Sequence, residues 1–324
     1  MIGLSLIIPF RNEASKISNL LSAITNQVEF PEEIIFVNDH SEDESENLIQ
    51  QWSDQNNIQI QLICLAANEF GKKEAIHQGV KNASSNYCLT IDSDVVFSPY
   101  FFKHWKIRLD CDMRIGKVIM TYSNFFTYFF AIDYMLFNAY NYFFSSLYIN
   151  SASGANLLFS RNQYLKWYDL VECKEKLSGD DYYLLRTFQQ KNLKIKMEMD
   201  DQTIVYTESS KTFKEFISQR KRWLKKIKLK WNSSEFIFAL LLFNYQLSPI
   251  YAGLFSLFSA DITLFFGVCL TKYLLDFGFL LNYHRKFNFV YFSLFFPIGI
   301  ICNPLMMSLI LIVKSKPVWK GREI

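Results

Sequence analysis

Two stretches near the C-terminus contain no charged residue, and they constrain the fold more than any other feature of the chain. They run from Phe236 to Ala260 and from Phe287 to Val313. Each exceeds the roughly 20 residues that a helix needs to cross the apolar core of a bilayer. The segment between them is also apolar but carries Lys272 and Asp276, which makes it a weaker span because charges are costly in lipid. We therefore expect the C-terminal quarter of the chain to be a membrane region.

The charge distribution indicates where this region begins. The formal net charge is +3, yet residues 211–230 contain nine basic side chains and one acidic one, Glu215. Positive charge beside an apolar span is typical of the cytoplasmic side, where it also meets anionic lipid. We expect a cytosolic domain over residues 1–230 and, over residues 231–324, a membrane region of two to three hydrophobic helices with a short basic tail. No nucleic-acid-binding motif accompanies the basic run, so we expect no nucleic-acid partner.

The first hundred residues alternate between short apolar runs and amphipathic segments. Strands are expected at 3–10, 33–37, 58–65 and 87–91, and helices at 12–27, 45–55 and 72–82. Such alternation predicts an α/β fold, a doubly wound and mostly parallel sheet with helices on both faces. Ligands of these sheets bind at the carboxyl ends of the strands, and Arg11, Asp39 and Asp92 are expected there.

The segment from Met120 to Ile149 is rich in phenylalanine and tyrosine, but Asp133, Asn138 and Asn141 interrupt it. We expect it to form a helix packed within the N-terminal domain, with some aromatic side chains near the membrane interface.

Two aspartates follow the fourth expected strand, in the sequence Asp92-Ser93-Asp94. Alternate residues of an extended segment point to the same face, so both carboxylates are expected to lie together. Carboxylate oxygens are the ligands that Mg²⁺ and Mn²⁺ prefer. A solvated polar turn is the alternative, and the apolar strand before Asp92 favours the metal site.

Four short segments follow one another in a fixed order. They are Asp92-Ser93-Asp94, Ser153-Gly154-Ala155-Asn156, Ser178-Gly179-Asp180-Asp181 and Gln219-Arg220-Lys221-Arg222-Trp223. Each alone is compatible with a turn, a strand start or a helix cap. Together, and followed by basic and then apolar sequence, they resemble the family 2 inverting glycosyltransferases, the group that includes cellulose, hyaluronan and ceramide-glucoside synthases. The resemblance covers roughly residues 1–230. It implies a nucleotide-binding α/β fold of the GT-A type, a nucleotide-sugar donor and a divalent cation, Mg²⁺ or Mn²⁺.

The resemblance also implies which residues bind the donor. They are Pro9, Arg11, Glu13, Asp39, Gly71, Lys72, Asp92, Gly154 and Asn156. Asp39 corresponds to the acid that accepts a hydrogen bond from the nucleotide base, and Asn156 to the residue beside the donor sugar. Asp94 corresponds to the direct metal ligand, whereas Asp92 reaches the ribose, or the metal through water. The chain departs from the family pattern at Asn38, where many members have a second aspartate.

The last two segments carry the expected chemistry of transfer. Inverting transfer needs one base that takes the proton of the acceptor hydroxyl, and the resemblance assigns this role to Asp181. Asp180 either holds its neighbour in place or caps the following helix. Gln219, Arg222 and Trp223 match the family signature Gln-x-x-Arg-Trp, with Arg222 facing the departing diphosphate and Trp223 offering an apolar face to the acceptor.

The resulting hypothesis is a membrane-bound enzyme of cell-envelope polysaccharide or glycolipid synthesis. It would move a sugar from a nucleotide-sugar donor, by default a UDP-sugar, to a lipid or lipid-linked glycan. A processive polysaccharide synthase and a polyprenyl-phosphate sugar transferase remain alternatives. A non-catalytic membrane scaffold is the alternative from another class of protein.

The positive-inside tendency also leads to an expectation about topology. An even number of crossings would keep the basic C-terminal tail in the cytosol. Pro297 and Pro304 could break the last apolar run into a re-entrant pair. We expect this arrangement, since it also leaves Arg285 and Lys286 cytosolic.

Overall fold

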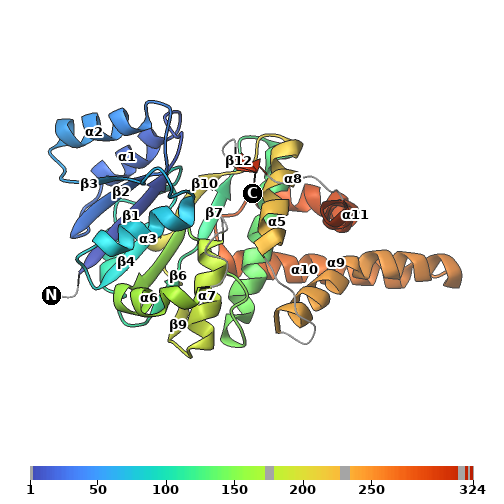
Figure 1. Ribbon diagram of the computed structural model, residues 1–324. Coiled ribbons are helices and arrows are strands. Elements are labelled where there is room, and N and C mark those ends of the chain that lie inside the picture. Colours follow the sequence, from blue (N-terminus) through green and yellow to red (C-terminus); the bar gives the residue numbers. More distant parts are fainter. Residues whose placement is uncertain (1–2, 172–178, 227–233, 313–317, 320–321, 324) are drawn as a thin grey trace. The chain divides into compact units, whose positions relative to one another are not determined.

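The computed structural model describes residues 3–171, 179–226, 234–312, 318–319 and 322–323 (Figure 1). The chain forms two compact units. Unit 1 comprises residues 1–119, 151–208 and 318–324, and unit 2 comprises residues 120–150 and 209–317. The expected boundary after residue 230 lies outside the described residues. The division into two units differs from the expected division at residue 230, because residues 120–150 group with the C-terminal helices.

A seven-stranded sheet forms the centre of unit 1, in the order β3-β2-β1-β4-β8-β6-β9. Its strands are β1 (Leu4–Phe10), β2 (Glu33–Asn38), β3 (Gln61–Cys64), β4 (Tyr87–Ile91), β6 (Met113–Ile115), β8 (Asn156–Ser160) and β9 (Ile195–Met197). The strands β3, β2, β1 and β4 are mutually parallel, and only β8 runs antiparallel to its neighbours. The predicted mostly parallel sheet is therefore confirmed. Every residue of β1 is buried, so this strand forms the centre of the core.

The remaining strands form two smaller sheets. One has the order β5-β10-β7, with β5 at Val96–Phe97, β7 at Val118–Thr121 and β10 at Val205–Glu208. The other is a two-stranded antiparallel pair of β11 (Val318–Trp319) and β12 (Arg322–Glu323).

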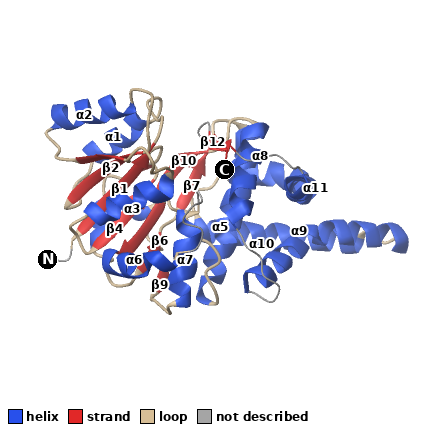
Figure 2. Ribbon diagram, in the orientation of Figure 1, coloured by secondary structure: helices blue, strands red, loops and turns tan. Residues whose placement is uncertain are grey.

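Helices cover both faces of the main sheet (Figure 2). They are α1 (Ile17–Thr25), α2 (Ser45–Asn56), α3 (Lys72–Asn82), α4 (Phe101–Lys106), α6 (Arg161–Trp167) and α7 (Asp180–Gln190), with 3₁₀ turns η2 (Tyr168–Leu170) and η3 (Asp201–Thr203). The helices α1 and α2 lie together on one face, and α3 lies on the other (Figure 1). This follows from right-handed crossovers, because the chain reverses its direction across the sheet when it passes from β3 to β4.

The helix α3 has the predicted bounds, whereas α1 begins at Ile17 instead of residue 12. Asn12 has a left-handed φ of 51°. The backbone N–H groups of Asn12 and Glu13 donate to the hydroxyls of Ser41 and Ser45 at 3.1 and 2.7 Å. Ser41 from the loop after β2 and Ser45 from the start of α2 thus hold this segment in a turn, and α1 begins only after it.

Unit 2 consists of helices. They are α5 (Phe125–Phe143), the 3₁₀ turn η1 (Phe144–Ser146), α8 (Phe213–Lys226), α9 (Ser234–Ser259), α10 (Thr263–Tyr283) and α11 (Phe289–Ile312). The aromatic segment does form a helix, as predicted, but α5 packs against α10 and α11 and belongs to unit 2. The expectation that it packs within the N-terminal domain is corrected accordingly.

Two helices among the described residues are long and apolar enough to cross a membrane, Phe236–Ser259 and Thr263–Tyr283. The charges of α10 do not exclude it, because they are paired inside unit 2. Lys272 Nζ lies 2.7 Å from Asp276 Oδ2, one turn away on the same helix. The hydroxyls of Tyr140 and Tyr245 each donate to Asp276 Oδ1 at 2.7 Å.

The last apolar run differs from the expected re-entrant pair. The helix α11 continues from Phe289 to Ile312 through Pro297 and Pro304. A proline removes one backbone donor and disturbs one turn, and helices of this apolar kind tolerate that locally. The basic residues Lys314, Lys316 and Lys320 of the tail lie outside the described residues.

Candidate active site

The polar residues expected at the strand ends do gather at one edge of the main sheet. Arg11 follows β1, Asp39 follows β2 and Asp92 follows β4. These strands are parallel, so their carboxyl ends share that edge. The strand order reverses between β1 and β4, which is where open α/β sheets usually bind ligands.

Lys72 is the centre of a charged cluster at this edge. Its ammonium lies 2.5 Å from Asp92 Oδ1 and 3.7 Å from Asp180 Oδ2. The first residue of α3 thereby joins the end of β4 to the start of α7. Burial disfavours the charged ammonium, but the carboxylates of Asp180 and Asp92 outweigh this effect and raise the pKa of Lys72 above its ordinary value. The lysine is therefore a permanent cation within the cluster.

The cluster occupies space beside residue 154 that is free because glycine has no Cβ atom. A Cβ atom at position 154 would overlap Asp180 Oδ2 and lie 3.1 Å from Lys72 Nζ. The backbone N–H of Gly154 donates to Asp181 Oδ2 at 3.3 Å, and the other oxygen of Asp181 accepts from Tyr182 N at 2.7 Å. The motif around Gly154 and the aspartate pair thus meet, as the resemblance implied. The preceding residue of the pair's motif, Ser178, lies outside the described residues.

The residues Asp92 and Asp94 fit a hard divalent cation that is shared with a ligand. Their side chains are 37% and 27% exposed, and each pairs with a lysine, Asp92 with Lys72 and Asp94 with Lys16 at 3.4 Å. Within the described part of the chain, no group of three or more metal-ligating side chains occurs. Mg²⁺ is often bound by one or two carboxylates together with substrate phosphates and waters. The two carboxylates of Asp92 and Asp94 can therefore hold such a cation only together with a phosphate-bearing ligand.

Asp39 and Gly71 are in direct contact, because Gly71 N donates to Asp39 Oδ2 at 3.1 Å. Gly71 has a φ of 95°, a conformation that favours glycine. Arg11 donates to the carbonyl oxygens of Asp39 and His40 at 2.7 and 2.6 Å. In this structure the guanidinium therefore fixes the loop after β2, a role that the sequence did not indicate.

Seven of the nine expected donor-binding residues are buried, among them Pro9, Glu13 and Asn156. Pro9 is an interior residue of β1, and Glu13 lies buried in the turn before α1. Asn156 is fully buried, and its amide donates to the carbonyl oxygens of Lys117 and Thr203 at 3.0 and 2.7 Å. The amide nitrogen of Asn156 thus joins backbone segments, and its expected contact with a sugar hydroxyl stays a prediction.

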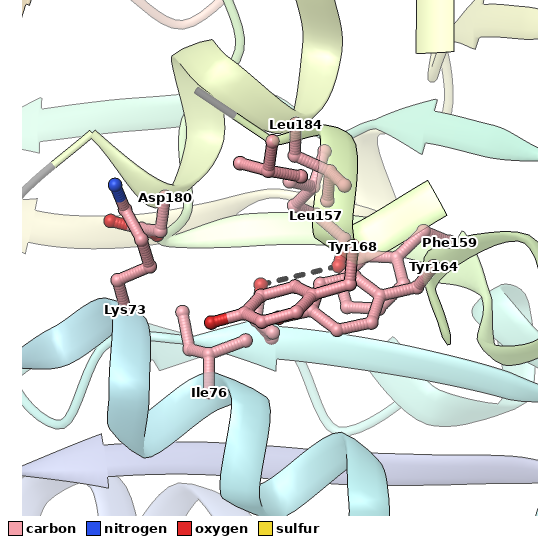
Figure 3. Close-up of a pocket in the computed structure, with 10 residues that line it drawn as sticks. Lys73, Ile76, Leu157, Phe159, Tyr164, Tyr168, Asp180 and Leu184 are labelled. Carbon is pink, nitrogen blue, oxygen red and sulfur yellow. Dashed lines mark hydrogen bonds between the residues drawn. The ribbon is translucent and has the colours of Figure 1, made fainter. Parts of the chain in front are cut away.

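A small pocket lies beside the cluster, with Asp180 and Lys73 at one end and aromatic side chains at the other (Figure 3). Ile76, Leu157, Phe159 and Leu184 contribute its apolar wall. Burial raises the pKa of Tyr164 and Tyr168, so both phenols are neutral. About 10 Å³ is open to a water-sized sphere, roughly the space for one water. This pocket is too small for a sugar.

The Gln-x-x-Arg-Trp segment lies on α8 in unit 2. The Trp223 ring packs against Tyr134 of α5, with the ring centroids 5.3 Å apart. Gln219 accepts a hydrogen bond from Arg220 Nη1 at 2.9 Å. Arg222 is half-buried on the same helix.

Sequence reasoning missed Lys16 and Arg220, two residues that contact the expected site residues Asp94 and Gln219. Lys16 is one lysine among many, and no spacing marks it as the partner of Asp94. Arg220 occupies an unspecified position of the signature. Its partner, Asp133, was detectable as the only acidic residue in the aromatic segment 120–149.

Comparison with known proteins agrees with this geometry. A family model described as glycosyl transferase family 2 matches residues 5–164, and one described as glycosyl transferase family group 2 matches residues 88–309. The poly-beta-1,6-N-acetyl-D-glucosamine synthase of Staphylococcus epidermidis is 33% identical over 95 residues, which are 29% of this chain and 22% of that protein. The synthase of Staphylococcus aureus strain COL is 31% identical over 123 residues, covering 36% and 27% respectively. The matched segments thus span about a quarter of these relatives.

A solved structure supports the fold. It is a mannosyltransferase from Pyrobaculum calidifontis in complex with GDP-Man and Mn²⁺, with a TM-score of 0.50 and 10% identity. The likeness covers 95% of this chain and 83% of that one. The family group 2 match extends over more than half of the 324 residues. The chain therefore belongs to glycosyltransferase family 2.

Proposed function

We propose that this protein transfers a sugar from a nucleotide-sugar donor to a lipid or lipid-linked glycan, with inversion at the anomeric carbon. The observation that carries the proposal is the cluster at the sheet edge. In this cluster Lys72 Nζ lies within 3.7 Å of carboxylate oxygens of both Asp92 and Asp180, and Gly154 lies beside them. Family membership supplies the class of reaction, and the apolar helices α9 and α10 support an acceptor held at a membrane.

In this proposal Asp181 is the base. It takes the proton of the acceptor hydroxyl while that oxygen bonds to the anomeric carbon and the nucleoside diphosphate leaves. Its two hydrogen bonds, from Gly154 N and Tyr182 N, fix the orientation of the carboxylate. Asp92 and Asp94 would hold the divalent cation, which supplies positive charge to the leaving diphosphate. Lys72 places a second positive charge beside the same carboxylates.

For the donor we propose a UDP-sugar, with the catalytic unit in the cytoplasm. N-acetylglucosamine is the first sugar to test, because the curated relatives are named as synthases of its polymer. GDP-mannose is the second, because the neighbour of similar fold binds GDP-Man with Mn²⁺. The names of the relatives also favour a second candidate function, repeated addition to a growing polysaccharide. Product length distinguishes single from repeated addition.

The test uses the full chain in detergent. We expect UDP to raise the melting temperature only when Mn²⁺ is present, and the protein to release UDP from a UDP-sugar in the presence of metal. Asp94→Ala should abolish both effects. Asp181→Asn should keep the thermal shift and reduce transfer by about 10²- to 10⁴-fold.

Asp54→Asn is a matched control, because Asp54 is exposed on α2 and remote from the strand ends. A scaffold would show no metal-dependent thermal shift with UDP, GDP or dTDP. Normal turnover in Asp94→Ala would contradict the metal assignment. Loss of donor binding in Asp181→Asn, with turnover preserved, would make Asp181 a binding residue.

A further inference from the structure

Arg220 lies in the Gln-x-x-Arg-Trp segment of α8 and is held by side-chain contacts on several sides. The residue is 7% exposed. Its Nε donates to Asp133 Oδ2 at 2.7 Å, its Nη2 to the carbonyl oxygen of Phe130 at 3.2 Å and its Nη1 to Gln219 Oε1 at 2.9 Å. Each guanidinium nitrogen therefore has an acceptor. Two of these acceptors belong to α5 and one belongs to the signature itself.

Aromatic rings cover the guanidinium as well. Its central carbon lies 4.5 Å from the ring centroid of Phe216 and 4.4 Å from that of Trp223. Residues four before and three after a position share its face of a helix, so α8 presents both rings to Arg220. Trp223 in turn packs on Tyr134, one residue after Asp133. The position of the Trp223 ring thus depends on contacts with Arg220 and with α5.

We infer that Arg220 is the positioning residue of the Gln-x-x-Arg-Trp segment. Although it occupies an unspecified position, it contacts both Gln219 and Trp223 and ties them to α5 through Asp133. In this inference it acts through Gln219 and Trp223, since it is 7% exposed and each of its guanidinium nitrogens already donates to a protein acceptor. The inference rests on the proposed function, together with the role on the acceptor and diphosphate side that the family signature implies for Gln219 and Trp223.

Arg220→Lys is the informative variant. A lysine keeps the charge and can pair with Asp133, but its donors share one nitrogen, so it cannot reproduce the spread of the guanidinium fork or stack a planar group between the rings. We expect turnover of the UDP-sugar to fall by about 10²-fold, the scale of a misplacement near 1 Å. The UDP concentration that gives half of the Mn²⁺-dependent thermal shift should stay unchanged. An anchor that only stabilises the fold would lower the melting temperature and leave turnover per folded molecule intact.

A spectroscopic readout makes the test independent of activity. The chain is labelled with 5-fluorotryptophan, and the Trp223 resonance is assigned with Trp223→Phe. Arg220→Lys should move or broaden that fluorine resonance alone, and Asp133→Asn should do the same from the other side of the ion pair. Arg285→Lys, an exposed arginine outside the helices, is the matched control and should change nothing.

An unchanged Trp223 resonance in both variants would overturn the inference, as would normal turnover in Arg220→Lys. If the unmodified protein consumes no nucleotide sugar, the proposed function fails. The fluorine spectra then still decide whether Arg220 and Asp133 position Trp223, so the two failures are distinguishable.

Discussion

At the scale of single residues, position 154 lies so close to the charged cluster that even a methyl group disturbs it. A Cβ there overlaps Asp180 Oδ2. The backbone of Gly154 is outside the left-handed region, so alanine adds no strain of its own. We expect Gly154→Ala to rotate the Asp180 carboxylate away from Lys72 and to reduce transfer by about 10²-fold. Transfer rates and melting temperatures of the purified variant measure this.

Gly267→Ala is the control, because a Cβ at position 267 meets no atom within 4 Å. Its activity should equal that of the unmodified protein. If Gly154→Ala transfers sugar at the normal rate, the contact between Lys72 and Asp180 is dispensable and Asp180 is only a helix residue.

The sequence predicted which residues meet at this edge better than what each one does. Lys72, Asp92, Gly154 and the aspartate pair come together as the motifs implied. The roles of Arg11 and Asn156 were not predictable, because their partners are backbone carbonyl oxygens. Such groups carry no sequence signal, and only the path of the folded chain brings them near.

At the scale of elements, α5 shows the limit of periodicity. Its composition predicted a helix, and a helix is present. Most of its surface is apolar and aromatic, so no single face identifies its partner. Its polar residues are more informative, because Asp133 and Tyr140 bind Arg220 on α8 and Asp276 on α10. The parallel strands were easier to predict, since short apolar runs between amphipathic segments leave few other arrangements.

The ion pair of α10 gives a prediction at this scale. Lys272→Leu leaves the Asp276 carboxylate buried without its cation, and breaking such a pair costs about 3–5 kcal/mol. The melting temperature in detergent should fall markedly. The double variant Lys272→Leu with Asp276→Leu removes both charges and should be more stable than the single one. Lys286→Leu, at an exposed position after α10, is the control. Equal stability of the single variant and the control would show that the pair contributes nothing.

At the scale of the whole molecule, α9 and α10 give a testable topology. If both cross the membrane, residue 261 between them lies on the far side, and residue 285 after α10 returns to the side of the basic helix α8. Single cysteines at these positions are placed in a background without the native cysteines. In intact cells an impermeant reagent should modify the cysteine at 261 and spare the one at 285. Equal labelling of both would contradict two crossings.

The unbroken α11 leaves the side of the C-terminal tail to a third single cysteine, placed after residue 321. The expected even number of crossings depended on a break at Pro297 or Pro304, and the helix has none. The expected break at these prolines was wrong, because a proline removes only one backbone donor and the helix continues on both sides of it.

The pairing of Lys272 with Asp276 also bears on how the protein is made. Both charges belong to one helix and lie one turn apart, so they can neutralise each other as soon as that turn forms. The nascent helix is then electrically neutral even before it packs against α5 and α9, which precede it in the chain. The hydroxyls of Tyr140 and Tyr245 add their hydrogen bonds to the carboxylate only when α5 and α9 pack against α10. If α10 crosses a membrane, its insertion therefore does not have to wait for assembly of the bundle.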